Sequence, residues 1–218
     1  YWPKKALEGR DADIVPCLRC MHCYHIATEH WNIQCSVNPR FRRENRVPRK
    51  LEKTVKPKTV VVVGGGPAGM KAVLTAEEQG HRVILLERAA QLGGQLNWAD
   101  YDDYKKELKA YREYLIRQIV EVRLETEATP EMIASLAPDD LILGLGAEFI
   151  TPRIPGAEYA RQAVTLYPEL DSAQGRFVII GGGTIGTELA LELAERGKAV
   201  TLIEMSDTLS AKGNKLYR

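Results

Sequence analysis

The sequence predicts an α/β fold that contains the same strand–helix–strand unit twice. Residues 60–87 and 177–204 align without an insertion at an offset of 117 positions. Each copy begins with a short β-branched run, typical of a buried parallel strand, and continues through a glycine-rich turn into a helical stretch. A glycine then ends each helix, and a second apolar strand closes on a glutamate. These shared features indicate two parallel-sheet units in tandem.

The elements follow from the apolar patterns. Each copy is expected to contain a strand, a helix and a second strand: Val60–Val63, Ala68–Gln79 and Arg82–Leu86, then Phe177–Ile180, Ile185–Arg196 and Ala199–Ile203. Between the copies we expect a strand, a short helix and a further strand at Ile119–Leu124, Pro130–Leu136 and Leu141–Leu143. A spacing of three to four residues separates Tyr101, Tyr104, Leu108, Tyr111 and Leu115. This spacing is typical of the buried face of an amphipathic helix, and we favour that interpretation over an aromatic cofactor site.

Both glycine-rich turns have the Gly-x-Gly-x-x-Gly spacing of Rossmann-like dinucleotide-binding folds. The first glycine allows a tight turn, the second lets the backbone approach a pyrophosphate, and the third lets the helix pack closely on the strand. The pyrophosphate sits at the helix N-terminus, and the acid, Glu87 or Glu204, receives the ribose hydroxyls. Because all these parts recur twice at one spacing, we interpret both copies as dinucleotide sites rather than as glycine-rich turns without a ligand.

The four cysteines of the chain lie in one segment, at Cys17, Cys20, Cys23 and Cys35. Three thiolates on a CxxCxxC turn, with a fourth from farther along, favour an iron-sulfur cluster. Zinc is the main alternative, although a structural zinc site normally pairs two CxxC units across a longer spacer. Disulfides are a third possibility, but no signal sequence is present and such crowding would strain them. A c-type haem is excluded because no histidine follows either CxxC pair.

Composition and charge favour a cytoplasmic protein. A net charge of +1 gives no indication of a nucleic-acid or membrane partner, and no apolar stretch approaches the roughly 20 residues of a membrane span. Residues 40–58 are rich in Arg and Lys and carry Pro48 and Pro57, so we expect a linker that wraps over adjacent domains. The second copy stops before a third strand, and we therefore interpret the chain as cut from a longer protein. The oligomeric state stays open.

The order of these motifs resembles the NADH:flavin oxidoreductases related to 2,4-dienoyl-CoA reductase and trimethylamine dehydrogenase. The resemblance covers essentially the whole chain and rests on the four cysteines, GGGPAG, ERxxxLGGQL, PRIPG and IIGGGTIGTE. It implies an N-terminal TIM barrel of the Old Yellow Enzyme type, absent from this chain, which carries FMN. In that family the barrel reduces an activated carbon-carbon double bond or oxidises an amine of a small-molecule substrate, so any catalytic residues would lie there.

The same resemblance implies residues for each cofactor. A 4Fe-4S cluster would be ligated by Cys17, Cys20, Cys23 and Cys35. FAD would be held by Gly64, Gly66, Pro67, Ala68, Gly69, Glu87, Arg88, Gly94, Gln95 and Gly146. NADH would be held by Gly181, Gly183, Thr184, Ile185, Gly186 and Glu204. The implied electron path runs from NADH to FAD, to the cluster, to FMN and to the substrate.

The domains expected on this basis are a cluster segment with its basic linker at 1–57, an FAD-binding domain at 58–156, a connector at 157–175 and a partial NAD(P)H-binding domain at 176–218. One departure from the family is Gly144-Leu145-Gly146, where Ala-Thr-Gly is common. ADP in place of FAD is an alternative for the first site, as in the trimethylamine dehydrogenase branch. Two other functions stay open: an electron-transfer partner like the glutamate synthase small subunit, and a structural module that binds ADP and zinc.

Overall fold

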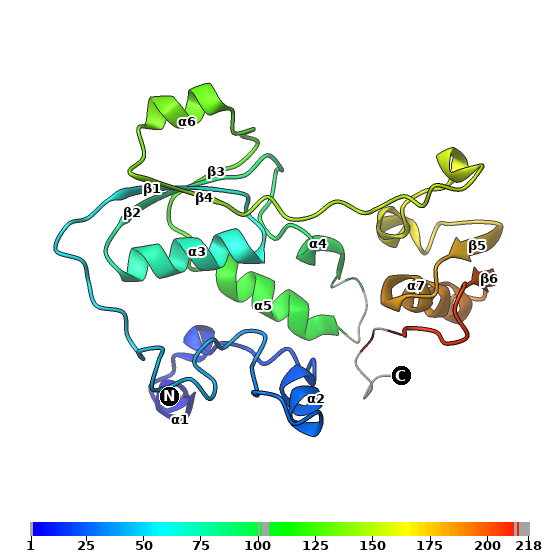
Figure 1. Cartoon of the computed structure of the whole chain (residues 1–218), viewed down its shortest axis with the longest axis horizontal. Helices are drawn as coiled ribbons and strands as arrows, with labels where there is room; N and C mark the ends of the chain where they lie inside the picture. The colour runs from blue at the N-terminus through cyan, green and yellow to red at the C-terminus, as the bar shows by residue number, and fades with distance from the viewer. Residues whose placement is uncertain (1, 100, 102–104, 212, 214–218) are drawn as a thin grey trace. The chain divides into compact units, whose positions relative to one another are not determined.

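The structure is a computed structural model that describes residues 2–99, 101, 105–211 and 213 (Figure 1). The chain divides into two compact units. The first comprises residues 1–20, 34–100 and 105–147, and the second comprises residues 21–33, 101–104 and 148–218. Each nucleotide-binding copy lies in its own unit, so the units are described separately.

The first unit is built on a parallel sheet of four strands in the order β3-β2-β1-β4. The strands span Thr59–Val63 (β1), Arg82–Leu86 (β2), Val122–Arg123 (β3) and Asp140–Leu143 (β4). In register, Val61 of the central strand lies between Ile84 and Leu141. The carboxyl ends of β1, β2 and β4 therefore meet at one edge, where the glycine loop begins.

Helices cover both faces of this sheet (Figure 1). On one face, α3 (Pro67–Glu78) and α5 (Lys106–Ile116) contribute Met70, Val73 and Leu115 to a core with strand residues such as Leu85. On the other face, α6 (Pro130–Leu136) packs Met132 and Leu136 against three strand residues: Val61, Ile84 and Leu86. Burial on both faces explains the continuous apolar runs of β1 and β2.

Local signals set the ends of these helices. Pro67 occupies the first position of α3, where its missing N–H costs no hydrogen bond. Gly80 follows the helix with a φ of 85°, a left-handed conformation that suits glycine. At α6, the Thr129 hydroxyl accepts a hydrogen bond of 3.2 Å from the Met132 N–H.

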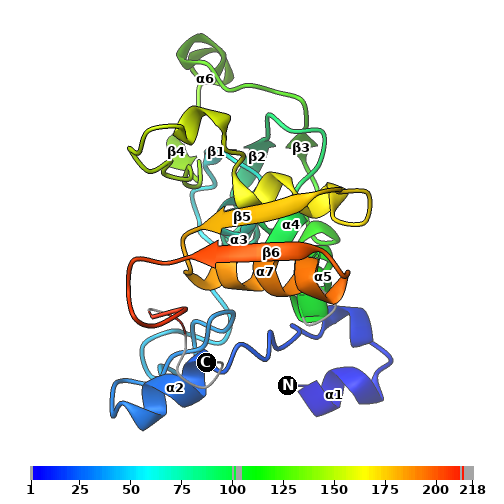
Figure 2. The same ribbon diagram turned by 90° about the vertical axis from the view of Figure 1, so that its right-hand side faces the viewer.

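The second unit contains the parallel pair β5 (Arg176–Ile180) and β6 (Ala199–Ile203). Helix α7 (Thr184–Glu195) covers one face of the pair (Figure 2). Short 3-10 turns precede β5, at Ala157–Tyr159 (η3), Ala163–Thr165 (η4) and Tyr167–Glu169 (η5). Buried residues of α7 and of these turns, including Leu189, Leu193 and Val164, form the interior. The unit also includes α2 (His22–Thr28).

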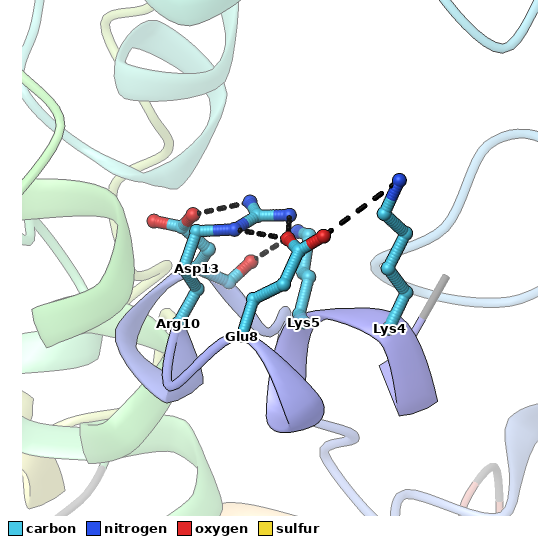
Figure 3. A network of polar contacts seen from close by, with 5 residues as sticks. All are labelled: Lys4, Lys5, Glu8, Arg10 and Asp13. Carbon is cyan, nitrogen blue, oxygen red and sulfur yellow. Dashed lines mark hydrogen bonds and ion pairs between the residues drawn. The ribbon is translucent and has the colours of Figure 1, made fainter.

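The N-terminal segment, within the first unit, is a short helix and turn held by charged side chains. Helix α1 (Trp2–Leu7) is followed by η1 (Asp11–Asp13). The Arg10 guanidinium donates to the carboxylates of Glu8 and Asp13, and Lys5 Nζ donates to the Asp13 carbonyl (Figure 3). Lys4 Nζ lies 3.7 Å from Glu8 (Figure 3). Because Lys4, Glu8, Arg10 and Asp13 are exposed and Lys5 is only half-buried, the network orders the turn locally and adds little to the stability of the unit.

Most of the sequence-predicted elements are confirmed within one or two residues, but two expectations are corrected. The strand expected at Ile119–Leu124 is reduced to Val122–Arg123, because only these residues pair with β2. In the aromatic stripe, Tyr111 and Leu115 are buried on α5, whereas Tyr101 lies outside that helix and its ring is 6.2 Å from Tyr167. Tyr104 lies outside the described residues.

The basic linker has no regular element among residues 40–58 and runs along the end of α3. The Leu51 N–H donates to the Glu78 carboxylate at 3.2 Å, and the Thr54 N–H donates to the Gln79 carbonyl at 2.8 Å. These contacts attach the linker to the first unit. Within the described residues, no helix is long and apolar enough to cross a membrane.

Candidate dinucleotide and cluster sites

The first glycine loop connects β1 to α3 and depends on two of its glycines for its shape. Gly64 has a φ of 103°, and its N–H donates to the Leu86 carbonyl at 2.8 Å. A methyl group on Gly69 would overlap the Gly64 carbonyl oxygen, because the helix starts directly against the turn. The fold therefore requires glycine at both of these positions.

Gly66 has no such structural requirement. Its φ of −73° and ψ of 179° are extended values that any residue adopts. A Cβ on Gly66 would have its nearest neighbour, the Gly94 Cα, at 3.9 Å. The fold therefore tolerates a side chain at this position, which is the N-cap of the 12-residue helix α3.

The second copy repeats this arrangement. Gly181 has a φ of 104°, and its N–H donates to the Ile203 carbonyl at 2.8 Å. A methyl group on Gly186 would overlap the Gly181 carbonyl oxygen, whereas a Cβ on Gly183 would meet nothing within 4 Å. Each Gly-x-Gly-x-x-Gly motif thus combines two glycines that the fold requires with one that it does not require.

The acid that ends each second strand turns back to its glycine loop. Glu87 accepts hydrogen bonds from the Gly65 N–H at 2.5 Å and the Ala89 N–H at 2.7 Å. Glu204 accepts equivalent bonds from the Gly182 N–H at 2.6 Å and the Ser206 N–H at 2.8 Å. Both oxygens of Glu87 and the Oε2 of Glu204 keep a further lone pair, so each acid can still accept a hydrogen bond from a ribose hydroxyl.

The structural repeat continues beyond the two acids. The Gly93 N–H donates to the Gly65 carbonyl at 2.9 Å, and the Ser210 N–H donates to the Gly182 carbonyl at 2.7 Å. The preceding leucines, Leu92 and Leu209, both lie over the middle glycine of their loop. Sequence reasoning missed this extension, although the spacing Glu-x-x-x-x-Leu at 87–92 and 204–209 signals it.

The other residues implied for FAD surround the first loop. Pro67 and Ala68 begin α3, and the exposed Arg88 follows Glu87. Gly94 lies close to the loop, because a Cβ on Gly94 would be 2.9 Å from the Gly66 Cα. Gln95 Nε2 donates to the Ala147 carbonyl at 3.0 Å. Gly146, with a φ of 79°, follows the end of β4 and has open space around it.

Two implied NADH residues, Thr184 and Ile185, occupy the exposed first turn of α7, which places them beside Gly183. None of these assignments is tested by an observed ligand, and all of them stay predictions.

The cysteine segment has an unusual backbone. Arg19 and Met21, the two neighbours of Cys20, both have a φ of 49°. Non-glycine residues rarely adopt this conformation. The Arg19 N–H donates to the Cys17 sulfur at 3.4 Å, and the Ser36 hydroxyl lies 3.3 Å from the Cys20 sulfur. Donors of this kind stabilise thiolates, so this part of the donor set fits a metal or cluster.

Contacts within the first unit fix the position of the segment. Arg19 forms an ion pair with Glu107 of α5, and Leu18 and Val37 pack against the core beneath it. No cysteine is in a disulfide, and Cys23 belongs to the second unit through α2. Among the described residues, no group of three or more His, Cys, Asp or Glu side chains gathers as a metal site. The four-cysteine ligand set therefore stays a prediction.

Comparison with known proteins identifies the relatives of this chain. The family model of the pyridine nucleotide-disulphide oxidoreductases matches residues 58–215. NADH oxidase of Thermoanaerobacter brockii is 42% identical over 94% of the chain, and cinnamate reductase of Clostridium sporogenes is 33% identical over 98%. The chain spans 33% of the length of each of these relatives.

Solved structures agree with this relationship. A 2-naphthoyl-CoA reductase complex superposes with a TM-score of 0.88 at 31% identity, over 99% of this chain and 34% of that one. Histamine dehydrogenase from Rhizobium sp. 4-9 shares the fold, with a TM-score of 0.80 at 23% identity over 95% of this chain and 34% of that one. The chain thus belongs to the pyridine nucleotide-disulphide oxidoreductases, among the flavin oxidoreductases related to 2,4-dienoyl-CoA reductase and trimethylamine dehydrogenase.

Proposed function

We propose that this chain is the electron-input portion of an NADH-dependent flavin and iron-sulfur oxidoreductase, with FAD in the first copy and NADH in the second. One observation carries the proposal. Each loop keeps a glycine, Gly66 or Gly183, at a position where the fold has room for a side chain. A ligand that must approach the backbone accounts for this choice in both copies.

The residues of both sites have definite tasks in this proposal. The backbone N–H groups at the starts of α3 and α7 bind the pyrophosphates. Glu87 and Glu204, each held by the N–H of its glycine loop, orient the ribose hydroxyls of the two ligands. The segment at Gly94, close against Gly66, covers the diphosphate in the first site.

The cysteine segment is proposed to hold a 4Fe-4S cluster through Cys17, Cys20, Cys23 and Cys35. When bound, FAD would accept a hydride as two electrons, and the cluster would carry electrons singly toward an FMN. The Arg19 N–H donates to the Cys17 sulfur, and the Ser36 hydroxyl would donate to Cys20 in its thiolate form, so both groups would support sulfur ligands.

The remaining parts of the proposal lie outside this chain. We propose that the longer protein carries an FMN barrel that reduces an activated carbon-carbon double bond. The names of two relatives, cinnamate reductase and 2-naphthoyl-CoA reductase, support a reductase. This chain by itself is then expected to lack substrate turnover, because the barrel residues are not part of it.

An anaerobic optical spectrum of the purified chain, recorded before and after addition of NADH, tests the proposal. The expected result is a flavin spectrum overlaid on broad iron-sulfur absorption, with bleaching of the flavin bands after NADH is added. A colourless protein that contains zinc and ADP would contradict it and would favour a structural module.

A further inference from the structure

Within the described part of the chain, Glu87 and Glu204 differ in one side-chain hydrogen bond. Both accept from the N–H of the middle loop glycine and from the N–H two positions beyond the acid, contributed by Ala89 in the first copy and Ser206 in the second. Among the described residues, a side chain adds to this set in the second copy only, because Ser206 Oγ lies 2.9 Å from Glu204 Oε1. Alanine at the matching position of the first copy has no hydroxyl to offer.

The Ser206 hydroxyl has two acceptors within reach but only one proton. Its Oγ lies 2.9 Å from the Glu204 carboxylate and 3.0 Å from the Thr208 carbonyl. A hydrogen bond to an ionised carboxylate is stronger than one to a neutral carbonyl, so the proton points to Glu204. The exposed Thr208 carbonyl can bind water instead.

With the Ser206 hydroxyl bond, both oxygens of the Glu204 carboxylate are held by hydrogen bonds. Glu204 Oε2 is held by the Gly182 N–H, and Oε1 is held by both the N–H and the hydroxyl of Ser206. To admit a 2'-phosphate, the carboxylate would have to swing away or become protonated. The three hydrogen-bond donors oppose a movement of the carboxylate. The same hydrogen bonds lower the pKa of Glu204 and so oppose its protonation, and the largest contributions come from the Ser206 and Gly182 N–H groups.

We propose that Ser206 is a positioning residue for cofactor selectivity: its hydroxyl locks the Glu204 carboxylate against the glycine loop and thereby excludes NADPH. This inference rests on the proposed function, in which the second copy binds NADH. The opposite role is also chemically reasonable for a serine, since a free hydroxyl could donate to a 2'-phosphate and favour NADPH. If the hydroxyl locks Glu204, its removal lowers the selectivity for NADH over NADPH. If the hydroxyl binds the 2'-phosphate, its removal raises that selectivity.

The test measures the dissociation constants of NADH and NADPH for the purified chain and its variants. In Ser206→Ala, the lock predicts that the selectivity for NADH over NADPH falls by roughly threefold or more. Ser206→Thr keeps the hydroxyl and is expected to keep the selectivity. Ala89→Ser, the matched change in the first copy, is expected to leave the selectivity for nicotinamide dinucleotides unchanged. Unchanged or increased selectivity in Ser206→Ala overturns the inference.

A second measurement needs no ligand. NMR titration of the Glu204 side-chain carboxyl should show a higher pKa in Ser206→Ala than in the parent chain and an unaltered one in Ser206→Thr. Equal values in all three proteins would contradict the lock. If the parent chain binds neither dinucleotide, the proposed function fails, whereas the lock is still decided by this titration.

Discussion

The three glycines of each Gly-x-Gly-x-x-Gly motif differ in what they contribute, and the difference becomes visible only at the scale of single residues. The sequence alone predicts all three from their spacing. The backbone angles and the space around each Cβ then separate Gly64 and Gly69, which the turn requires, from Gly66, which it does not require. Spacing cannot make this distinction, because it contains no information on where neighbouring atoms lie.

A pair of alanine substitutions tests this division. Gly69→Ala should destabilise the first unit by more than about 3 kcal/mol, because the methyl group overlaps the Gly64 carbonyl. Gly66→Ala should change stability by no more than about 1 kcal/mol, since its φ suits alanine and only the helix cap is weakened. Chemical denaturation followed by circular dichroism measures both. Similar losses in the two variants would refute the distinction.

The identity of the acid in the second copy predicts cofactor preference. Glu204 should accept the ribose hydroxyls of NADH and repel the 2'-phosphate of NADPH, so we expect NADH to bind at least about tenfold more tightly. Hydrogen bonds from the Ser206 and Gly182 N–H groups lower the pKa of Glu204, and the carboxylate should therefore keep this preference in mildly acidic solution. Glu204→Arg should shift the preference to NADPH. Equal affinities in the parent chain would show that Glu204 does not face the ribose.

At the scale of secondary structure, apolar periodicity predicts the long elements well and the short ones poorly. Strands β1 and β2 and helix α3 are confirmed almost to the residue, because burial on both faces leaves a strong pattern. The length of strand β3 is overestimated, because apolar residues occur from Ile119 to Leu124 but only Val122 and Arg123 pair with β2. Helix α2, whose seven residues include Cys23, was not expected, because its pattern is too short to recognise.

The packing of α5 gives a prediction at this scale. Leu115 is 1% exposed and closes the core between α5 and α3. Leu115→Ala should lower the free energy of unfolding of the first unit by about 2–5 kcal/mol, through lost burial and the cavity that remains. Lys109→Ala, on the exposed side of the same helix, is the control and should change it by less than about 0.5 kcal/mol. Equal effects would mean that α5 does not pack as described.

For the whole molecule, the duplicated unit is the feature that the sequence predicts best, since a repeat at one offset needs no tertiary information. The extension of the repeat to Leu92 and Leu209 was not expected, because the shared spacing of one Glu and one Leu is a weak signal until the backbone hydrogen bonds beyond each acid are seen. The cluster site is different, because the spacing of the four cysteines along the sequence does not show how close their sulfur atoms lie in three dimensions. The expected domain bounds likewise stay predictions.

Metal content tests the cysteine segment. After anaerobic purification, the chain should contain about four iron and four sulfide ions per molecule. Cys20→Ser should lose most of both, while Ser36→Ala, which removes only a hydroxyl beside the sulfur, should retain them. Stoichiometric zinc in the anaerobic protein would contradict the assignment of an iron-sulfur cluster.

The central claim is that the two copies bind different dinucleotides, FAD in the first and NADH in the second. The most direct test is chromatographic identification of the nucleotide released from the purified parent chain, Gly66→Ala and Gly183→Ala. We predict about one FAD per molecule in the parent and in Gly183→Ala and a strongly reduced amount in Gly66→Ala. Release of ADP instead of FAD, or loss of FAD in Gly183→Ala but not in Gly66→Ala, would contradict the account.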